Sequence, residues 1–168
     1  MKLAIFMMPL HPPGKSYPQS LREDREAIIL ADKLGFEEAY VGEHVTDVAE
    51  TVTHCMTFLA SLVSETKRIK LGTGIMQLAA RTPANAAMSA ATVDAMAGGG
   101  RFIAGIGVSG PQIVEGWYGQ PWGKPYWRMK DYVAIMRKIF ARDEPVTHAG
   151  REISLPYTGE GSAGLAKP

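Results

Sequence analysis

The sequence predicts an α/β protein in which parallel strands alternate with helices. Short apolar runs of strand length recur along the chain, apolar residues at helical spacing follow each run, and glycine or proline separates them. Because strands joined by helices pair in parallel, this alternation predicts one sheet with helices packed on it. The pattern by itself leaves two architectures open, a doubly wound open sheet and part of a (β/α) barrel.

Four strand–helix units are expected in succession. The strands are predicted at residues 3–8, 39–42, 69–76 and 102–106, and the helices at residues 20–34, 57–63, 83–96 and about 132–140. The first strand is apolar on both faces and ends before Pro9, which is typical of a strand buried on both sides. Gly35 is expected to end the first helix and Gly98–Gly100 the third.

The carboxyl-terminal residues have a different composition. Residues 1–145 are expected to form the domain of four units, and residues 146–168 a hairpin followed by a Gly/Pro-rich tail. The hairpin would occupy Val146–Leu155 and turn at Ala149 and Gly150, while Pro156–Pro168 resembles a linker.

The composition excludes several classes of protein. The chain has 168 residues, 46% of them hydrophobic and 21% charged, and a formal net charge of +1, which is ordinary for one globular domain. A balanced charge without a basic tract argues against nucleic-acid binding. No apolar run approaches the roughly 18 residues that span a bilayer, and no cleavage site follows the first strand. We therefore expect a cytoplasmic protein without a membrane partner.

Cysteine and histidine usage predicts no metal site and no disulfide. Cys55 is the single cysteine, and it is expected to be a small core residue because no base adjoins it. The four histidines show neither the HExxH pattern nor the Cys/His spacing of zinc sites.

Ligands of parallel α/β folds bind at the carboxyl ends of the strands, and His44 follows the second strand there. An imidazole in this position could move a proton near physiological pH. The alternative, favoured by position alone, is an ordinary half-buried loop histidine. Glu43 precedes it, but consecutive strand residues point to opposite faces, so the two need not touch.

Glycines interrupt the third strand and follow the fourth. Gly72-Thr73-Gly74 indicates a bulge with a flat ligand against the backbone, or close packing with a helix. Gly105–Gly110 fits G-x-G-x-x-G, but it follows the fourth strand, and the candidate acid Asp131 lies in a predicted helix, so we reject a dinucleotide fingerprint. The run either lets backbone N–H groups approach a phosphate or forms a tight turn without a ligand.

Five aromatic side chains lie within Trp117–Trp127, directly after the glycine loop. They could wall an apolar pocket. Packing onto the protein's own scaffold or onto a partner subunit is the alternative.

In order and spacing, these segments resemble the luciferase-like superfamily of flavin-dependent monooxygenases and deazaflavin-dependent oxidoreductases. The resemblance covers essentially the whole chain. Five segments carry it, and they include all four predicted strands and the start of the third helix. In chain order they are Lys2–Met8, Gly35–His44, Arg68–Gly74, Pro83-Ala84 and Gly100–Gly107.

The resemblance implies a TIM-type barrel that binds reduced FMN or coenzyme F-420 at the carboxyl ends of its strands. His44 matches the active-site histidine of the family. Thr73, Gly74 and Ile75 match the bulge under the cofactor ring, where the family often has a non-proline cis peptide. The loop near the phosphate-bearing tail is matched by Gly107, Val108, Ser109 and Gly110.

The resemblance predicts an oxidoreductase in which reduced FMN activates O₂ for oxidation of a small organic substrate. Residues up to Gly74 look like those of the FMN-using members, whereas Ser109–Gly119 and Gly164–Pro168 look like those of deazaflavin users. Hydride transfer by coenzyme F-420 is therefore an alternative. A non-catalytic half-barrel is another.

A barrel of this type has eight βα units, and this chain supplies about four. Half a barrel leaves sheet edges with unpaired backbone groups, which something must cover. We therefore expect a homo-oligomer, a carboxyl-terminal half supplied separately, or a chain that is a fragment of an enzyme.

Overall fold

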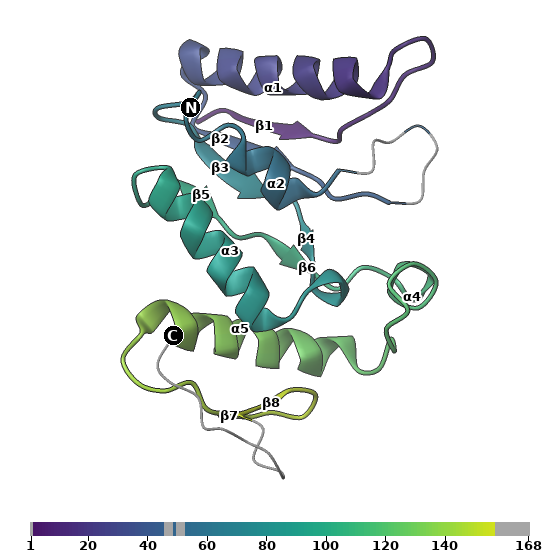
Figure 1. Ribbon diagram of the computed structural model, residues 1–168, viewed down its shortest axis with the longest axis vertical. Coiled ribbons are helices and arrows are strands. Elements are labelled where there is room, and N and C mark those ends of the chain that lie inside the picture. Colours follow the sequence, from purple (N-terminus) through teal and green to yellow (C-terminus); the bar gives the residue numbers. More distant parts are fainter. Residues whose placement is uncertain (1, 46–48, 50–52, 157–168) are drawn as a thin grey trace. The chain divides into compact units, whose positions relative to one another are not determined.

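The computed structural model describes residues 2–45, 49 and 53–156, which divide into two compact units (Figure 1). The first unit comprises the described residues of 1–77 together with 89–107. The second comprises 78–88 and those from 108 onward. The division falls inside helix α3 (Pro83–Met96), whose bounds are those predicted from the sequence.

The first unit is built on a parallel sheet with the strand order β1-β2-β3-β5. These strands are Ala4–Met7, Glu38–Val41, Lys70–Thr73 and Phe102–Ile103. Their registers align the carboxyl ends along one edge. A second parallel pair is formed by β4 (Met76–Gln77) and β6 (Ile106–Gly107). The predicted α/β class with parallel strands is confirmed.

Two of the predicted strands are each broken in two. A cis peptide between Gly74 and Ile75 separates β3 from β4, and Ala104-Gly105 separates β5 from β6. The Met76 N–H donates to the Gly105 carbonyl oxygen at 2.8 Å, so the two interruptions lie side by side. The sequence predicted an irregularity, a bulge, at the glycines of the third strand. The structure has a stronger irregularity there, because the strand is divided into β3 and β4.

Helices α1 (Tyr17–Leu34) and α2 (Cys55–Ala60) contact β1 and β3, respectively. Helix α1 begins three residues before the predicted start, because the Ser16 hydroxyl caps it and accepts from the Gln19 N–H. It ends at Gly35, whose φ of 88° is readily adopted only by glycine. Helix α2 begins two residues early because His54 Nδ1 accepts the Thr57 N–H at 3.2 Å.

The apolar core of the first unit is formed by the helices and by the alternate strand residues that face them. Fully buried residues include Ile28, Ala39, Val41, Cys55, Leu59, Leu62, Ile69 and Leu71. Cys55 is a core residue, as predicted. Because strand side chains alternate, the opposite face of the sheet carries Phe6, Tyr40 and Gly72, which lie in one row of the register.

Two aspartates, the buried Asp32 and the half-buried Asp94, fix the chain where it enters strands of the first unit. The Asp32 carboxylate accepts backbone N–H bonds from residues 67–69 at 2.7–3.0 Å, and Asp94 accepts them from residues 100–102 at 2.8–2.9 Å. Burial opposes ionisation of Asp32, but these N–H donors outweigh it and lower the pKa of the carboxyl. Backbone donors, the Gly100 N–H first, likewise lower the pKa of Asp94.

The second unit contains α5 (Pro125–Ala141), the short helices η1 (Leu78–Ala80) and α4 (Pro111–Val114), and a hairpin. Helix α5 is longer than the apolar spacing predicted, because Pro125 is well suited to a first helical turn. The predicted hairpin is present and pairs β7 (His148–Ala149) with β8 (Ser154–Leu155). Its turn spans Gly150–Ile153, and Ala149, which was predicted in the turn, pairs with Ser154 in the ladder. Residues 157–168 of the predicted tail lie outside the described residues, and the division at residue 145 stays a prediction.

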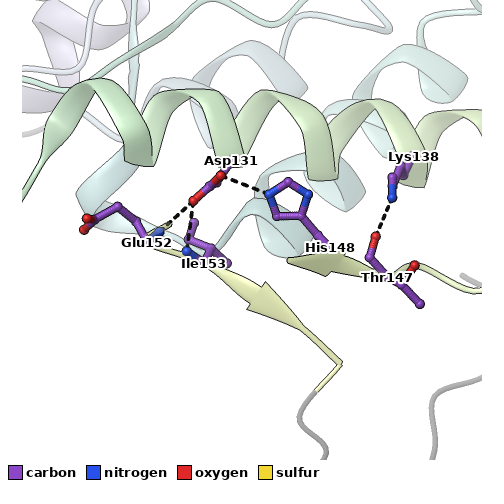
Figure 2. Close-up of polar contacts among 6 residues, drawn as sticks. All are labelled: Asp131, Lys138, Thr147, His148, Glu152 and Ile153. Atoms are coloured by element: carbon purple, nitrogen blue, oxygen red, sulfur yellow. Dashed lines mark hydrogen bonds and ion pairs between the residues drawn. The ribbon is translucent and has the colours of Figure 1, made fainter. Parts of the chain in front are cut away.

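Asp131 attaches the hairpin to α5 (Figure 2). Its carboxylate accepts the N–H groups of Glu152 and Ile153 at 2.8 and 3.1 Å, and it lies 3.0 Å from Nε2 of His148. Burial opposes ionisation, but these bonds prevail and lower the pKa of Asp131. As predicted, this aspartate lies in a helix, and it serves a structural contact.

Among the described helices, none combines the length and the apolar character that crossing a bilayer requires.

Candidate functional site

His44 lies just beyond β2, at the carboxyl edge of the first unit's sheet, and it is half-buried. A Cβ atom placed on Gly42 would lie 2.9 Å from both Nε2 and Cδ2 of His44 and 3.5 Å from the Gly74 carbonyl oxygen. Only glycine leaves room for the ring at this point. The imidazole is therefore held against the backbone at the ends of β2 and β3.

Glu43 points away from this site and anchors the segment that carries His44. Its carboxylate accepts the Gln77 backbone N–H at 3.1 Å, and its carbonyl oxygen accepts the Gln77 side-chain amide at 2.7 Å. Both residues are buried. These two bonds direct the Glu43 carboxylate to Gln77.

Thr73 is 1% exposed, and its hydroxyl donates to the Gly105 carbonyl oxygen at 2.6 Å. The side chain thus joins the interruptions of the two broken strands. Because the Thr73 side chain is buried, it could affect a cofactor site only by fixing the backbone conformation of the two strand breaks.

Gly74 and Ile75 lie at the accessible surface of the site. Ile75 is 36% exposed, and Phe6, whose ring would lie 2.8 Å from a Cβ atom on Gly74, is 54% exposed. A glycine backbone flanked by two exposed apolar side chains offers a surface on which a flat apolar ring can lie.

Gly72 has a different role from the ligand contact or helix packing considered from the sequence. A Cβ atom there would lie 2.6 Å from two ring carbons of Tyr40, in the neighbouring strand. The Tyr40 ring therefore fills this space. Its hydroxyl donates to the Glu38 carboxylate at 2.7 Å, which with burial raises the pKa of the phenol.

The predicted glycine loop is divided between the two units. Gly107 ends β6 in the first unit and lies against the Ile75 side chain. A Cβ atom placed on Gly107 would lie 2.7 Å from Cδ1 of Ile75. Val108, Ser109 and Gly110 belong to the second unit, where Ser109 has a φ of 60°. Gly110 precedes the four-residue helix α4 and offers no side chain to cap it.

The second unit has an open cavity of about 440 Å³ that the sequence reasoning missed. Residues 78–83 and α5 line most of it, and its lining includes Arg81 and Arg128, whose guanidinium lies 4.0 Å from the Glu152 carboxylate. Tyr132 supports the wall, since its hydroxyl lies 3.2 Å from the carbonyl oxygens of Arg81 and Thr82. Arg128 and Tyr132 are four residues apart on one helix, but no local pattern reveals that residues 78–83 lie against them.

The aromatic segment packs partly on its own unit. The guanidinium of Arg151 lies 3.8 Å from the ring centre of Trp127, and Tyr126 contacts Trp127 edge to face at 4.9 Å. Trp117 and Tyr126 remain exposed. Packing on the protein's own scaffold therefore accounts for Trp127.

Over the described ranges, no three His, Cys, Asp or Glu side chains gather as metal ligands would. The site at His44 offers an imidazole, backbone amides and an apolar surface. These groups can position a flat ring and move a proton, but none of them is a redox group.

Residues 1–163 match the family of luciferase-like monooxygenases. A putative coenzyme F-420-dependent oxidoreductase of Mycobacterium tuberculosis is 46% identical over 84% of this chain, which corresponds to 39% of that protein. The 4-hydroxyprotoasukamycin monooxygenase of Streptomyces nodosus is 32% identical over 84% of this chain and 38% of its own length. The chain thus spans about two fifths of the length of these relatives.

Solved structures show the same fold. The oxygenating constituent of a Pseudomonas putida 3,6-diketocamphane monooxygenase, in complex with FMN, superposes with a TM-score of 0.81 at 23% identity, covering 99% of this chain and 47% of that one. A coenzyme F-420-dependent tetrahydromethanopterin reductase of Methanopyrus kandleri gives 0.72 at 22% identity, covering 92% and 44%.

Proposed function

Because this chain belongs to the luciferase-like monooxygenase family, we propose that it forms part of an oxidoreductase that uses a reduced flavin or deazaflavin coenzyme. The observation that carries the proposal is the position of His44 beside Gly42 and the Gly74 carbonyl. A proton-transferring group thereby adjoins the surface that a flat ring can cover.

The residues of the first unit fit such a ring. The Phe6 ring lies where a side chain on Gly74 would project, and both Phe6 and Ile75 are exposed, so a planar aromatic system can lie on the apolar surface that they form. We propose that Gly74 and Ile75 hold the ring, while Thr73 sets the shape of the backbone below them. Gly107, Val108, Ser109 and Gly110 remain predicted contacts of the phosphate-bearing tail.

The bound coenzyme would supply the redox chemistry, and the protein would supply orientation, proton handling and exclusion of water. The His44 imidazole would hold or release a proton at a ring nitrogen beside the substrate. Phe6 and Ile75 would keep water from the covered face of the ring. Glu43 and Gln77 would keep the histidine in place.

Two coenzymes are candidates for this site, and the relative with 46% identity favours coenzyme F-420 and hydride transfer to a small organic substrate. Reduced FMN, activating O₂ for oxidation of such a substrate, is the second candidate. It is supported by the likeness of residues up to Gly74 to FMN-using members and by the related monooxygenase of Streptomyces nodosus.

Fluorescence titration of the purified chain with FMN and with coenzyme F-420, in parallel, tests the proposal. Saturable binding of one coenzyme is expected, and oxygen consumption with the reduced coenzyme then separates oxygen activation from hydride transfer. Binding of neither would contradict a ring site within this chain and favour a non-catalytic half-barrel.

The His44→Ala variant tests the assigned role of the imidazole. Turnover is expected to fall by about 10²–10⁴-fold, the usual contribution of general acid–base catalysis, with little change in coenzyme affinity. His148→Ala in the second unit is the matched control. Undiminished turnover in the His44 variant would contradict the role proposed for this residue.

A further inference from the structure

An acidic side chain of the hairpin lies beside one of the arginines that line the cavity of the second unit. Arg128 belongs to the first turn of α5, and its guanidinium is 4.0 Å from the carboxylate of Glu152. The Arg128 side chain is 22% exposed and that of Glu152 is 19% exposed. Charges that are enclosed to this degree interact more strongly than charges in open solvent, so the pair affects any charged ligand of the cavity.

Arg128 also adjoins the loop in which we predict contacts to the phosphate-bearing tail of the coenzyme. Val108, in that loop, lines one small cavity of the second unit together with Arg128 and Trp122. A guanidinium suits a phosphate group, because its N–H donors match the phosphate oxygens in pairs. Arg81 lines the larger cavity with Arg128. The second unit thus presents cationic side chains where an oxyanion of the ligand is expected.

The hairpin fixes Glu152 through its backbone. The Glu152 N–H donates to the Asp131 carboxylate at 2.8 Å, and the Ile153 N–H does so at 3.1 Å. Figure 2 shows that the Glu152 carboxylate itself points away from Asp131. Since Arg128 and Asp131 are three residues apart, they lie on the same side of α5. One helix face therefore holds both the backbone and the side chain of Glu152.

The segment before α5 encloses the same pair. A Cβ atom on Gly123 would lie 2.9 Å from a guanidinium nitrogen of Arg128 and 3.3 Å from a carboxylate oxygen of Glu152. Only glycine leaves this space open, and its φ of 59° also favours glycine. The pair is therefore held by three segments of the chain, unlike an ion pair between two flexible side chains at an open surface.

A carboxylate fixed beside an anion-binding guanidinium acts against the anion. Without a ligand, the carboxylate compensates the charge of Arg128. When an oxyanion binds, the same carboxylate repels it. The separation of 4.0 Å exceeds the roughly 2.7–2.9 Å of a charge-assisted hydrogen bond, so the contact with Glu152 leaves guanidinium N–H donors for a ligand.

We propose that Glu152 determines the specificity of this cavity, because it acts as an internal counter-ion of Arg128 and limits the affinity of the second unit for a phosphate group. A phosphate group alone then binds weakly, and a ligand needs its ring contacts as well. The inference deepens the proposed function and rests on it for the source of the phosphate, which is the tail of FMN or of coenzyme F-420.

Titration of the intact chain with inorganic phosphate tests the counter-ion role directly. Tryptophan fluorescence reports binding, since Trp122 lines the small cavity with Arg128. The Glu152→Gln variant removes the charge and keeps the shape of the side chain. It should bind phosphate about tenfold more tightly than the unmodified chain, as expected when a like charge beside the anion is removed.

Further variants show whether the gain depends on charge and on Arg128. The gain should vanish in the double variant Arg128→Gln/Glu152→Gln, because the two residues act as a pair. Glu152→Asp keeps the charge and should show little gain, whereas Glu152→Ala should gain like Glu152→Gln. Glu144→Gln, at an exposed acid that follows α5, is the matched control and should bind like the unmodified chain.

A comparison of FMN, coenzyme F-420 and riboflavin, which is FMN without its phosphate, identifies the source of the anion. Glu152→Gln should tighten binding of the two phosphate-bearing coenzymes and leave riboflavin affinity unchanged. If phosphate binds as predicted but no coenzyme does, the proposed redox function fails while the counter-ion role stands.

Four results would overturn the counter-ion role. They are phosphate binding by neither the unmodified chain nor Glu152→Gln, equal phosphate affinity of the two, weaker binding by the variant, and an equal gain for riboflavin. Weaker binding would mean that Glu152 orients Arg128 toward the anion instead of competing with it.

Discussion

Glu43 and Gln77 are joined by two hydrogen bonds across 34 residues of sequence, carboxylate to backbone N–H and carbonyl to side-chain amide. The pair connects the segment after β2 with β4. Since His44 directly follows Glu43, the position of the imidazole depends on Gln77, a residue outside the surface that we propose binds the coenzyme ring.

Replacement of Gln77 by alanine tests this positioning role. The loss of one buried side-chain bond is expected to reduce the free energy of unfolding by about 1–3 kcal/mol. Turnover should fall while coenzyme affinity changes little, and Gln77→Glu should not restore turnover because its carboxylate would face the Glu43 carbonyl. Chemical denaturation and steady-state kinetics provide the two readouts. An Ala variant with lower stability but unchanged turnover would show that Gln77 has no positioning role.

Acid should destabilise the protein through Asp32, Asp94 and Asp131. The pKa of each is lowered in the folded state, so each contributes stability that is complete above the ordinary aspartate value of 3.8, which applies to the unfolded chain. This contribution is lost as the pH falls through the lower folded values. Urea unfolding between pH 7 and pH 2 should show a decline beginning near the unfolded pKa. Asp32→Asn should flatten that decline, and an unchanged profile would contradict the assignment.

Asp24 is expected to act in the opposite direction. Its folded pKa is raised, so folding favours the protonated form, and the cost of ionisation grows as the pH rises through and above the unfolded value. Asp24→Asn should therefore raise the melting temperature of the isolated chain at pH 7 and leave it nearly unchanged at pH 3. Glu26→Gln should have little effect at either pH. A lower melting temperature for Asp24→Asn at pH 7 would contradict the raised pKa of Asp24.

The hairpin should detach from α5 when Asp131 is replaced by alanine. Two backbone N–H groups and His148 lose their acceptor, which is expected to cost about 2–4 kcal/mol locally. Tryptic cleavage after Arg151 should accelerate accordingly. His148→Ala, which removes one contact of the three, should give a smaller increase. Equal cleavage rates in the Asp131 variant and the unmodified chain would show that other contacts hold the hairpin.

Local sequence patterns predicted most of the first-unit elements and the position of His44 just beyond the second strand. The alanine-rich composition and the glycine stops located α3 at about its observed bounds, and Gly35 located the end of α1, because propensity and capping act within a few positions. The helix starts at Tyr17 and Cys55 were missed, since the capping side chains of Ser16 and His54 lie in segments without apolar periodicity.

The sequence by itself determined the alternation of strands and helices, the burial of Cys55 and the place of His44 at the carboxyl end of a strand. Only the tertiary structure decided that Tyr40 fills the space at Gly72, that Gln77 holds Glu43, and that Oδ2 of Asp24 is enclosed without a donor. The physical reason is the range of the interactions. Periodicity and capping depend on neighbours along the chain, whereas these contacts join residues about 30 apart or depend on what surrounds a buried atom.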